Sequence, residues 1–313
     1  MNPGLMLCLV LLATFGLSTL MLSGLVALAW RAGLQPRLIA TTELLTLRLL
    51  PTFGSALIVL TVVLPAFLSQ EPPHQREAAG PLLLALATCS LVALGHGIWR
   101  ARRACVDAEV LLRTCGPVKR RLLDCGQEIE VVDVAEPIVA VIGSWHPRVI
   151  AAECVVSTCS PAEFQQVIAH EAAHQFARDN LKQLLLLASP DALAWTPWGT
   201  ELIERWRGAA ELEADQRASG SDPFKRLALA SALIKVARAF GSGRVARPAL
   251  SMPIVADDVE GRVRQLLAPP TSRPRTRTGA IAMGLWFLLL PAAALPLYHW
   301  VHEFIEALVS AGL

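Results

Sequence analysis

The sequence predicts a mainly α-helical membrane protein with a small α+β domain inserted between its third and fourth membrane spans. Three observations support this fold class: four long uncharged apolar runs, arginines gathered at one end of each run, and a stretch after the third run that mixes strand-like segments with a strongly capped helix. Hydrophobic residues make up 54% of the 313 residues and charged residues only 17%. The chain is therefore more apolar than a typical soluble domain.

The apolar excess is concentrated in four runs, and each has the roughly 20 residues that a helix needs to cross a bilayer core. The runs are Leu5–Trp30, Leu49–Ser69, Ala78–Trp99 and Gly279–Tyr298. Buried core helices are the alternative, but the remaining chain is too short to enclose four of them. We therefore expect a three-span region at 1–99, a domain at 100–278, and a fourth span with a short tail at 279–313.

Positive residues predict the orientation, because loops rich in Lys and Arg stay on the cytoplasmic side. No Lys or Arg precedes the first run, which also argues against a secretory signal peptide. Arg31 and Arg37 follow the first run, and Arg48 precedes the second. The third run is followed by Arg100, Arg102 and Arg103, and the fourth is preceded by Arg273, Arg275 and Arg277. We expect both termini outside and residues 100–278 in the cytoplasm. The basic residues at 273–277 fit a topology signal or a contact with anionic lipid, so no direct nucleic-acid binding is expected.

Within 100–278, residues 100–125 predict a helix that leaves the membrane and a turn near Gly116. Short apolar runs at 128–134, 138–142 and 148–152 predict the strands of a small sheet. Ser160, Pro161 and Glu163 form a capping box that begins a helix. Further helices are expected at 201–219, 227–240 and 259–267, with a loop at 241–253. The leucine- and tryptophan-rich stretch 184–206 lies on the membrane surface or forms a core helix.

The capped helix contains the motif His170-Glu171-Ala172-Ala173-His174. Histidines at i and i+4 lie one turn apart, so both rings can reach one zinc ion. The glutamate after the first histidine can deprotonate a zinc-bound water molecule. These three side chains predict a catalytic zinc site that lacks one protein ligand.

Glu211 is the expected third ligand, because it lies in an E-x-x-A-D element on a predicted helix after the motif. Asp215 lies at i+4 from Glu211, and we expect it to accept the second ring N–H of a histidine ligand. Glu213 is on the opposite side of that helix and is the less favoured ligand.

With these motifs the chain resembles the BlaR/MecR-type membrane metallopeptidases, a gluzincin family. The resemblance also includes the segments 143–150, 177–181 and 261–267, and the order of three spans, a cytoplasmic zinc domain and a fourth span. It implies one catalytic Zn²⁺ held by His170, His174 and Glu211, with Glu171 as the catalytic base, in the inner membrane of a bacterium. Sensor members of the family continue into an extracellular penicillin-binding domain. This sequence shows none, so direct antibiotic sensing by it is not expected.

The expected function is therefore zinc-dependent hydrolysis of peptide bonds in a cytoplasmic or membrane-proximal protein, as regulatory proteolysis in signal transduction. The substrate could be a transcriptional repressor or the chain itself, and could pair with an exposed edge of the 138–152 strands. The only tyrosine, Tyr298, lies at the far interface, so His146 or Arg217 are the candidates for stabilising the tetrahedral intermediate. An HtpX-like quality-control protease and a non-catalytic signalling scaffold are the alternatives. The oligomeric state is left open.

Overall fold

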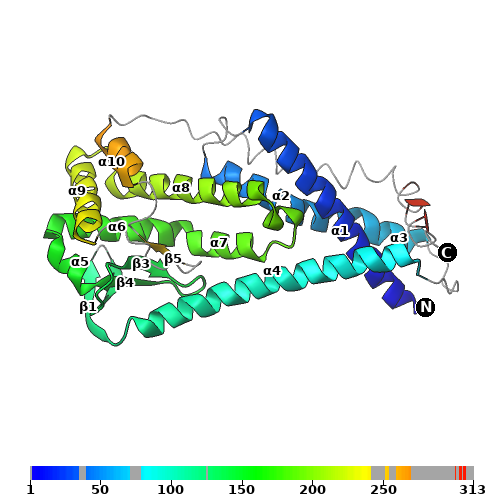
Figure 1. Cartoon of the computed structure of the whole chain (residues 1–313), viewed down its shortest axis with the longest axis horizontal. Helices are drawn as coiled ribbons and strands as arrows, with labels where there is room; N and C mark the ends of the chain where they lie inside the picture. The colour runs from blue at the N-terminus through cyan, green and yellow to red at the C-terminus, as the bar shows by residue number, and fades with distance from the viewer. Residues whose placement is uncertain are drawn as a thin grey trace. The chain divides into compact units, whose positions relative to one another are not determined.

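The computed structural model describes residues 2–34, 40–70, 79–124, 126–240, 251–253 and 259–268, with a few residues between 300 and 307 (Figure 1). This part of the chain is mainly helical and contains a five-stranded sheet. Its contacts divide it into two compact units. One includes Met1–Trp99 and Ala188–Trp206, and the other Arg100–Leu187 and Arg207–Pro274. The expected fourth span, Gly279–Tyr298, lies outside the described residues.

Three helical segments are long and apolar enough to cross a membrane, as the first three apolar runs predict. The first consists of α1 (Pro3–Ala29) and η1 (Trp30–Leu34), the second of α2 (Thr41–Ile58), η2 (Val59–Val63) and α3 (Leu64–Gln70), and the third is α4 (Pro81–Thr114). Asn2 caps the first by accepting the backbone N–H of Gly4. The second begins earlier than the predicted 49–69, so Arg48 lies within a helix instead of before it.

Small residues bring the first and third of these helices close together. A Cβ atom on Gly16 of α1 would lie 2.0 Å from the Ser90 hydroxyl of α4. Such close approach is typical of helix packing in membranes, where small residues increase van der Waals contact. The adjoining apolar core contains Met6, Val10, Ala13, Val63, Phe67, Leu83 and Ala87.

Residues 188–206 belong to the first unit, although in the sequence they lie between two parts of the second unit. They contain η3 (Ala192–Trp195) and the beginning of α8 (Pro197–Ser219). Asp191 accepts hydrogen bonds from Arg48 at 2.8 and 3.0 Å and from the Thr52 hydroxyl at 2.7 Å. The indole N–H of Trp30 donates to Glu201 at 3.0 Å. A buried carboxylate requires a cationic partner, and the nearest one available to Asp191 is Arg48 on α2.

The sheet belongs to the second unit and has the strand order β1-β2-β4-β3-β5. The strands are β1 (Val118–Asp124), β2 (Gln127–Val132), β3 (Val139–Ile142), β4 (Arg148–Ala152) and β5 (Ser251–Pro253). β2 and β4 are parallel, and the other neighbours are antiparallel. The three predicted strands are confirmed. The residues of β1 were expected to be helix and turn, and those of β5 to be loop, so both strands correct the prediction.

Besides the Arg100–Thr114 part of α4, six helices belong wholly or partly to the second unit (Figure 1). They are α5 (Glu153–Thr158), α6 (Pro161–Ala177), α7 (Asp179–Ala188), the second half of α8, α9 (Pro223–Phe240) and α10 (Val259–Leu267). The capping box at the start of α6 is confirmed: Ser160 accepts the backbone N–H of Glu163, and Glu163 accepts that of Ser160. Val167 and Ile168 of α6 pack with Val139 of β3 and Leu233 of α9 in the core. This core fixes the face of α6 that bears the motif.

Candidate metal centre

Helices α6 and α8 bring the three expected ligands together. His170 and His174 lie one turn apart on the buried face of α6, with 0% and 2% of their surface exposed. Glu211 comes from α8 and is 5% exposed. The ligand atoms of these three side chains lie within 4.8 Å of one another. The structure therefore assembles, in one buried cluster, residues that are far apart in the sequence.

The distances within this ligand cluster suit a tetrahedral metal ion. The two Nε2 atoms of His170 and His174 are 3.1 Å apart. Glu211 Oε1 lies 3.4 Å from His174 Nε2, and Glu211 Oε2 lies 3.5 Å from His170 Nε2. Zinc–ligand bonds of about 2.0–2.1 Å give tetrahedral edges of about 3.3 Å. The three observed separations are close to that value.

Carboxylates behind the imidazoles orient both rings. The Nδ1 atom of His174 is hydrogen-bonded to Asp179 at 2.9 Å, and Lys182 donates to the other oxygen of Asp179 at 2.8 Å. The Nδ1 atom of His170 lies 2.9 Å from Asp215, within ion-pair distance but without hydrogen-bond alignment. A ring that donates through Nδ1 keeps a lone pair on Nε2 for a metal. Asp215 lies beside His170, but the expected hydrogen bond is not aligned. Asp179 belongs to the segment 177–181 of the family resemblance, although no role was assigned to it from the sequence.

The electrostatics of the cluster depend on burial and on its carboxylates. Burial alone would lower the pKa of His174, but Asp179 and Glu211 raise it to about 10. Burial would likewise raise the pKa of Glu211, yet Arg262 and the two imidazoles hold it well below its ordinary value. Glu211 is thus kept as the charged form that binds metal ions.

Glu171 lies beside the ligands, fully buried, and is held by strand β3. Its Oε2 atom accepts the backbone N–H of Val141 at 2.9 Å, while its Oε1 atom has no hydrogen-bond partner among the described residues. Asn180 donates to the carbonyl groups of Val141 and Gly143 at 2.9 and 3.0 Å, which fixes this part of β3. Burial raises the pKa of Glu171 to about 7, although the neighbouring imidazoles oppose the increase. One carboxylate oxygen is therefore anchored and the other is available to a water molecule.

Arg262 is the cationic group of this cluster; it lies in the segment 261–267 of the family resemblance, but no role was assigned to it from the sequence. It lies on α10 and is 3% exposed. Its guanidinium group donates to both oxygens of Asp215 at 2.8 and 2.6 Å and forms an ion pair of 2.8 Å with Glu211 Oε2. The buried face of α10 shows why Arg262 turns inward, since Leu266 at i+4 is buried on the same side.

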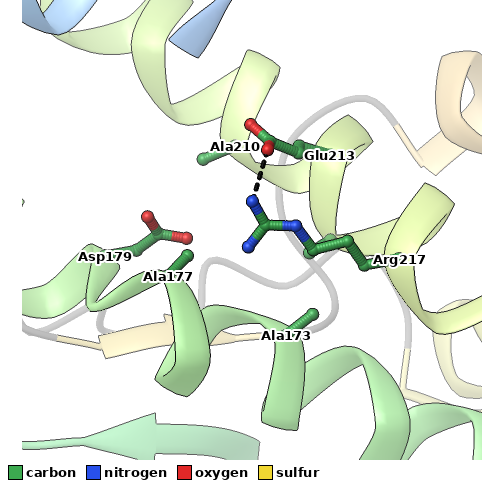
Figure 2. A pocket seen from close by; sticks show the side chains of 7 residues that line it. Ala173, Ala177, Asp179, Ala210, Glu213 and Arg217 are labelled. Carbon is green, nitrogen blue, oxygen red and sulfur yellow. Dashed lines mark hydrogen bonds and ion pairs between the residues drawn. The ribbon is translucent and has the colours of Figure 1, made fainter. Parts of the chain in front are cut away.

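Neither expected stabiliser of the intermediate contacts the ligand cluster in the described structure. His146 is exposed in the turn between β3 and β4. Arg217 donates to Glu213 at 2.6 Å and lies over the ring of Phe176. Figure 2 shows this pair at a small pocket whose other side chains include Ala173, Ala177, Asp179 and Ala210. Arg217 and Glu213 are i,i+4 partners on α8, so the Glu213 carboxylate pairs with Arg217 and is not part of the ligand cluster.

Strand β5 occupies the edge of β3 that was expected to be open to a substrate. Its backbone pairs with β3 in antiparallel register, with Met252 opposite Val141 and Ser251 opposite Ile142. Val141 is also the residue whose N–H holds Glu171. A segment of the chain itself therefore lies as an added strand beside the candidate catalytic base.

The donor set fits zinc, because two imidazole nitrogens and one carboxylate oxygen converge. Glu211 Oε2 forms an ion pair with Arg262 but accepts no hydrogen bond from the described residues. His₂Glu is a ligand set of catalytic zinc sites. Comparisons with protein-family models, curated proteins and solved structures gave no match for this chain.

Proposed function

We propose that this protein is a membrane-anchored zinc endopeptidase that cleaves a regulatory protein or its own chain. One observation carries the proposal: two imidazole nitrogens and a carboxylate meet at metal-chelating distances beside Glu171, whose Oε1 atom has no hydrogen-bond partner among the described residues. A purely structural zinc site needs no such base. The three apolar helices support a membrane location. The fourth span, the outside termini and the cytoplasmic domain in a bacterial inner membrane are part of the proposal.

In this mechanism, His170, His174 and Glu211 would hold a zinc ion, which when bound would supply Lewis-acid activation of water and of the scissile carbonyl group. Glu171 accepts a proton from the attacking water through Oε1 and passes it to the leaving nitrogen. The Val141 N–H keeps the other oxygen in place, so the carboxylate does not rotate away. A pKa of about 7 lets Glu171 exchange a proton in both directions near neutral pH.

The pairing of β5 with β3 favours self-cleavage among the possible substrates. Extended peptides are commonly recognised by adding a strand to a sheet edge. Here the added strand is Ser251–Pro253, beside the residue that anchors the base. A foreign substrate would need the same edge, so β5 must first leave it. Cleavage of the chain near β5 would remove that strand.

Replacing the base tests the proposal. Full-length protein and a Glu171→Gln variant are purified in detergent, loaded with zinc and followed for self-cleavage and for cleavage of co-expressed cytoplasmic proteins. Glu213→Gln is the matched control, because it makes the same change on the side of α8 that faces Arg217. We expect Glu171→Gln to lose at least 100-fold in rate and the control to keep its rate. Equal cleavage by wild type and Glu171→Gln would contradict the proposed mechanism.

Two further measurements separate the alternatives. Equal zinc content in wild type and His170→Ala would contradict the ligand assignment. Proteomics of membranes that contain the active protein or Glu171→Gln distinguishes the enzyme classes. Accumulation of one regulator supports signalling, whereas accumulation of many misfolded membrane proteins supports an HtpX-like quality-control role. No change in any protein, together with normal zinc binding, would favour the non-catalytic scaffold.

A further inference from the structure

Arg262 is an arginine whose burial requires an explanation. Helix α10 carries two arginines, two residues apart, with opposite environments. Arg264 is 77% exposed in its side chain and pairs with the exposed Glu260. Arg262 is 3% exposed and is enclosed with acidic side chains of α8. A buried guanidinium group is expensive to desolvate, so its partners must define its role.

Those partners are two carboxylates of the candidate metal centre: Glu211, a candidate ligand, and Asp215, which lies beside a candidate ligand. One guanidinium group contacts Glu211 and Asp215, which are i and i+4 on α8. Asp215 in turn lies 2.9 Å from Nδ1 of His170. Arg262 is thereby connected to Glu211 directly and to His170 through one carboxylate. Without it, two buried negative charges would face each other across one helical turn.

The contacts also distinguish the two oxygens of Glu211. Arg262 Nη1 lies 2.8 Å from Oε2, and its planar group is fixed by the bidentate contact with Asp215. The other oxygen, Oε1, faces the second imidazole instead, 3.4 Å from His174 Nε2. A lysine could supply the charge but not this three-way fork, because an ammonium group is a point charge without a planar array of donors.

We propose that Arg262 is a positioning residue, which holds Glu211 and Asp215 in the orientation that the metal requires and makes α10 a structural part of the metal centre. The inference rests on the zinc site of the proposed function, but it does not depend on peptidase activity. Loss of an outer partner of a metal ligand typically lowers metal affinity 10–100-fold. That loss is the expected effect of removing the guanidinium group.

The test uses full-length protein in detergent and measures zinc affinity by competition with a chromophoric chelator. Arg262→Gln is compared with wild type and with Arg264→Gln, the matched control on the exposed side of α10. We expect about 10–100-fold weaker zinc binding for Arg262→Gln and a change of less than about threefold for Arg264→Gln. Zinc affinity of Arg262→Gln within threefold of wild type would overturn the inference.

Arg262→Lys keeps the inference falsifiable if the glutamine variant does not fold. Its far-ultraviolet circular dichroism and thermal midpoint report folding, and the visible spectrum of bound Co²⁺ reports ligand geometry. We expect a folded protein with an altered Co²⁺ spectrum and zinc affinity between those of wild type and Arg262→Gln. A Co²⁺ spectrum and zinc affinity identical to wild type would contradict the positioning role. A different result would contradict only the peptidase proposal. In that case Arg262→Gln would still bind zinc more weakly than wild type, but Glu171→Gln would cleave as fast as wild type.

Discussion

The ion pair between Arg48 and Asp191 offers the clearest test of how the first unit is stabilised. Both side chains have 0% exposure, and the Asp191 carboxylate accepts hydrogen bonds from Nη1 of Arg48 and from the Thr52 hydroxyl. The Nε and Nη2 atoms of Arg48 have no hydrogen-bond partner in the structure. Asp191 is therefore the charge that compensates Arg48. Asp191→Asn preserves the shape of the side chain and removes only this compensation.

Breaking a buried pair from one side costs about 3–5 kcal/mol, because the remaining charge stays buried. For a chain of this size, that corresponds to a decrease in the thermal midpoint of about 5–10 °C. The assay is thermal unfolding of the detergent-solubilised protein, monitored by tryptophan fluorescence at one fixed heating rate. Asp107→Asn is the control, since Asp107 forms a 4.0 Å pair with Arg103 at an exposed site. Exposed pairs contribute less than about 1 kcal/mol.

A double variant separates charge from packing. Replacing both partners by apolar side chains, as in Arg48→Met/Asp191→Leu, removes the uncompensated charge along with the pair. Such replacements are often neutral or stabilising, so we expect the double variant to recover most of the lost midpoint. The reasoning is refuted if Asp191→Asn unfolds within 2 °C of the Asp107→Asn control (roughly the measurement error) or if the double variant unfolds lower than Asp191→Asn.

Three further predictions concern single residues, each followed by thermal unfolding or thiol labelling. Burial alone would raise the pKa of Glu163, but hydrogen bonds from Lys235, Ser231 and Ser160 lower it to about 2. Wild type should therefore be about 1–2 kcal/mol more stable than Glu163→Gln at neutral pH. This advantage should disappear as the pH falls from about 5 towards 2, and a constant difference would contradict it. A Cβ atom on Gly97 would lie 2.3 Å from the carbonyl oxygen of Ala188, whereas a Cβ atom on Gly95 would have no described atom within 4 Å. Gly97→Ala should destabilise by about 1–3 kcal/mol and Gly95→Ala should not, so equal midpoints would disprove the close approach. Burial raises the pKa of Cys159 to about 11. At pH 7.5 maleimide should react with Cys159 only after unfolding, and rapid labelling of the folded protein would show that the thiol is accessible.

Most of the helices, and the grouping of His170, His174 and Glu211, could be predicted from sequence patterns. Apolar runs of sufficient length predict spans regardless of their partners. The Ser160 capping box predicts where α6 begins, and the i,i+4 spacing of His170 and His174 predicts that both rings share a face. Glu211 follows from the requirement of zinc for a third protein ligand. These arguments need no information about tertiary packing.

The elements that could not be predicted depend on contacts between distant segments. β1 contains Lys119, Arg120 and Arg121, and it forms a strand because β2 offers acidic partners, as in the pair between Arg121 and Glu128. Segment 188–206 joins the first unit through Asp191, whose partner is far away in the sequence. Arg262 lies in the segment 261–267 of the family resemblance, but the helical pattern did not indicate its acidic partners. A helical pattern shows that a residue lies on one face, but it does not show which acidic cluster that face meets.

The enclosure of the metal centre bears on the choice between regulated and broad-specificity proteolysis. His170 and Glu171 are fully buried, and Glu211 is 5% exposed, so a peptide cannot reach them in this conformation. Strand β5 also occupies the edge of β3 next to the base. A protease that processes many misfolded proteins needs a binding edge that is open to each of them, whereas a regulated protease needs one that opens on a signal. β5 pairs with β3 over only three residues, so its release breaks few of the described backbone pairings. The closed site with a short covering strand therefore favours proteolysis that begins after an activating step.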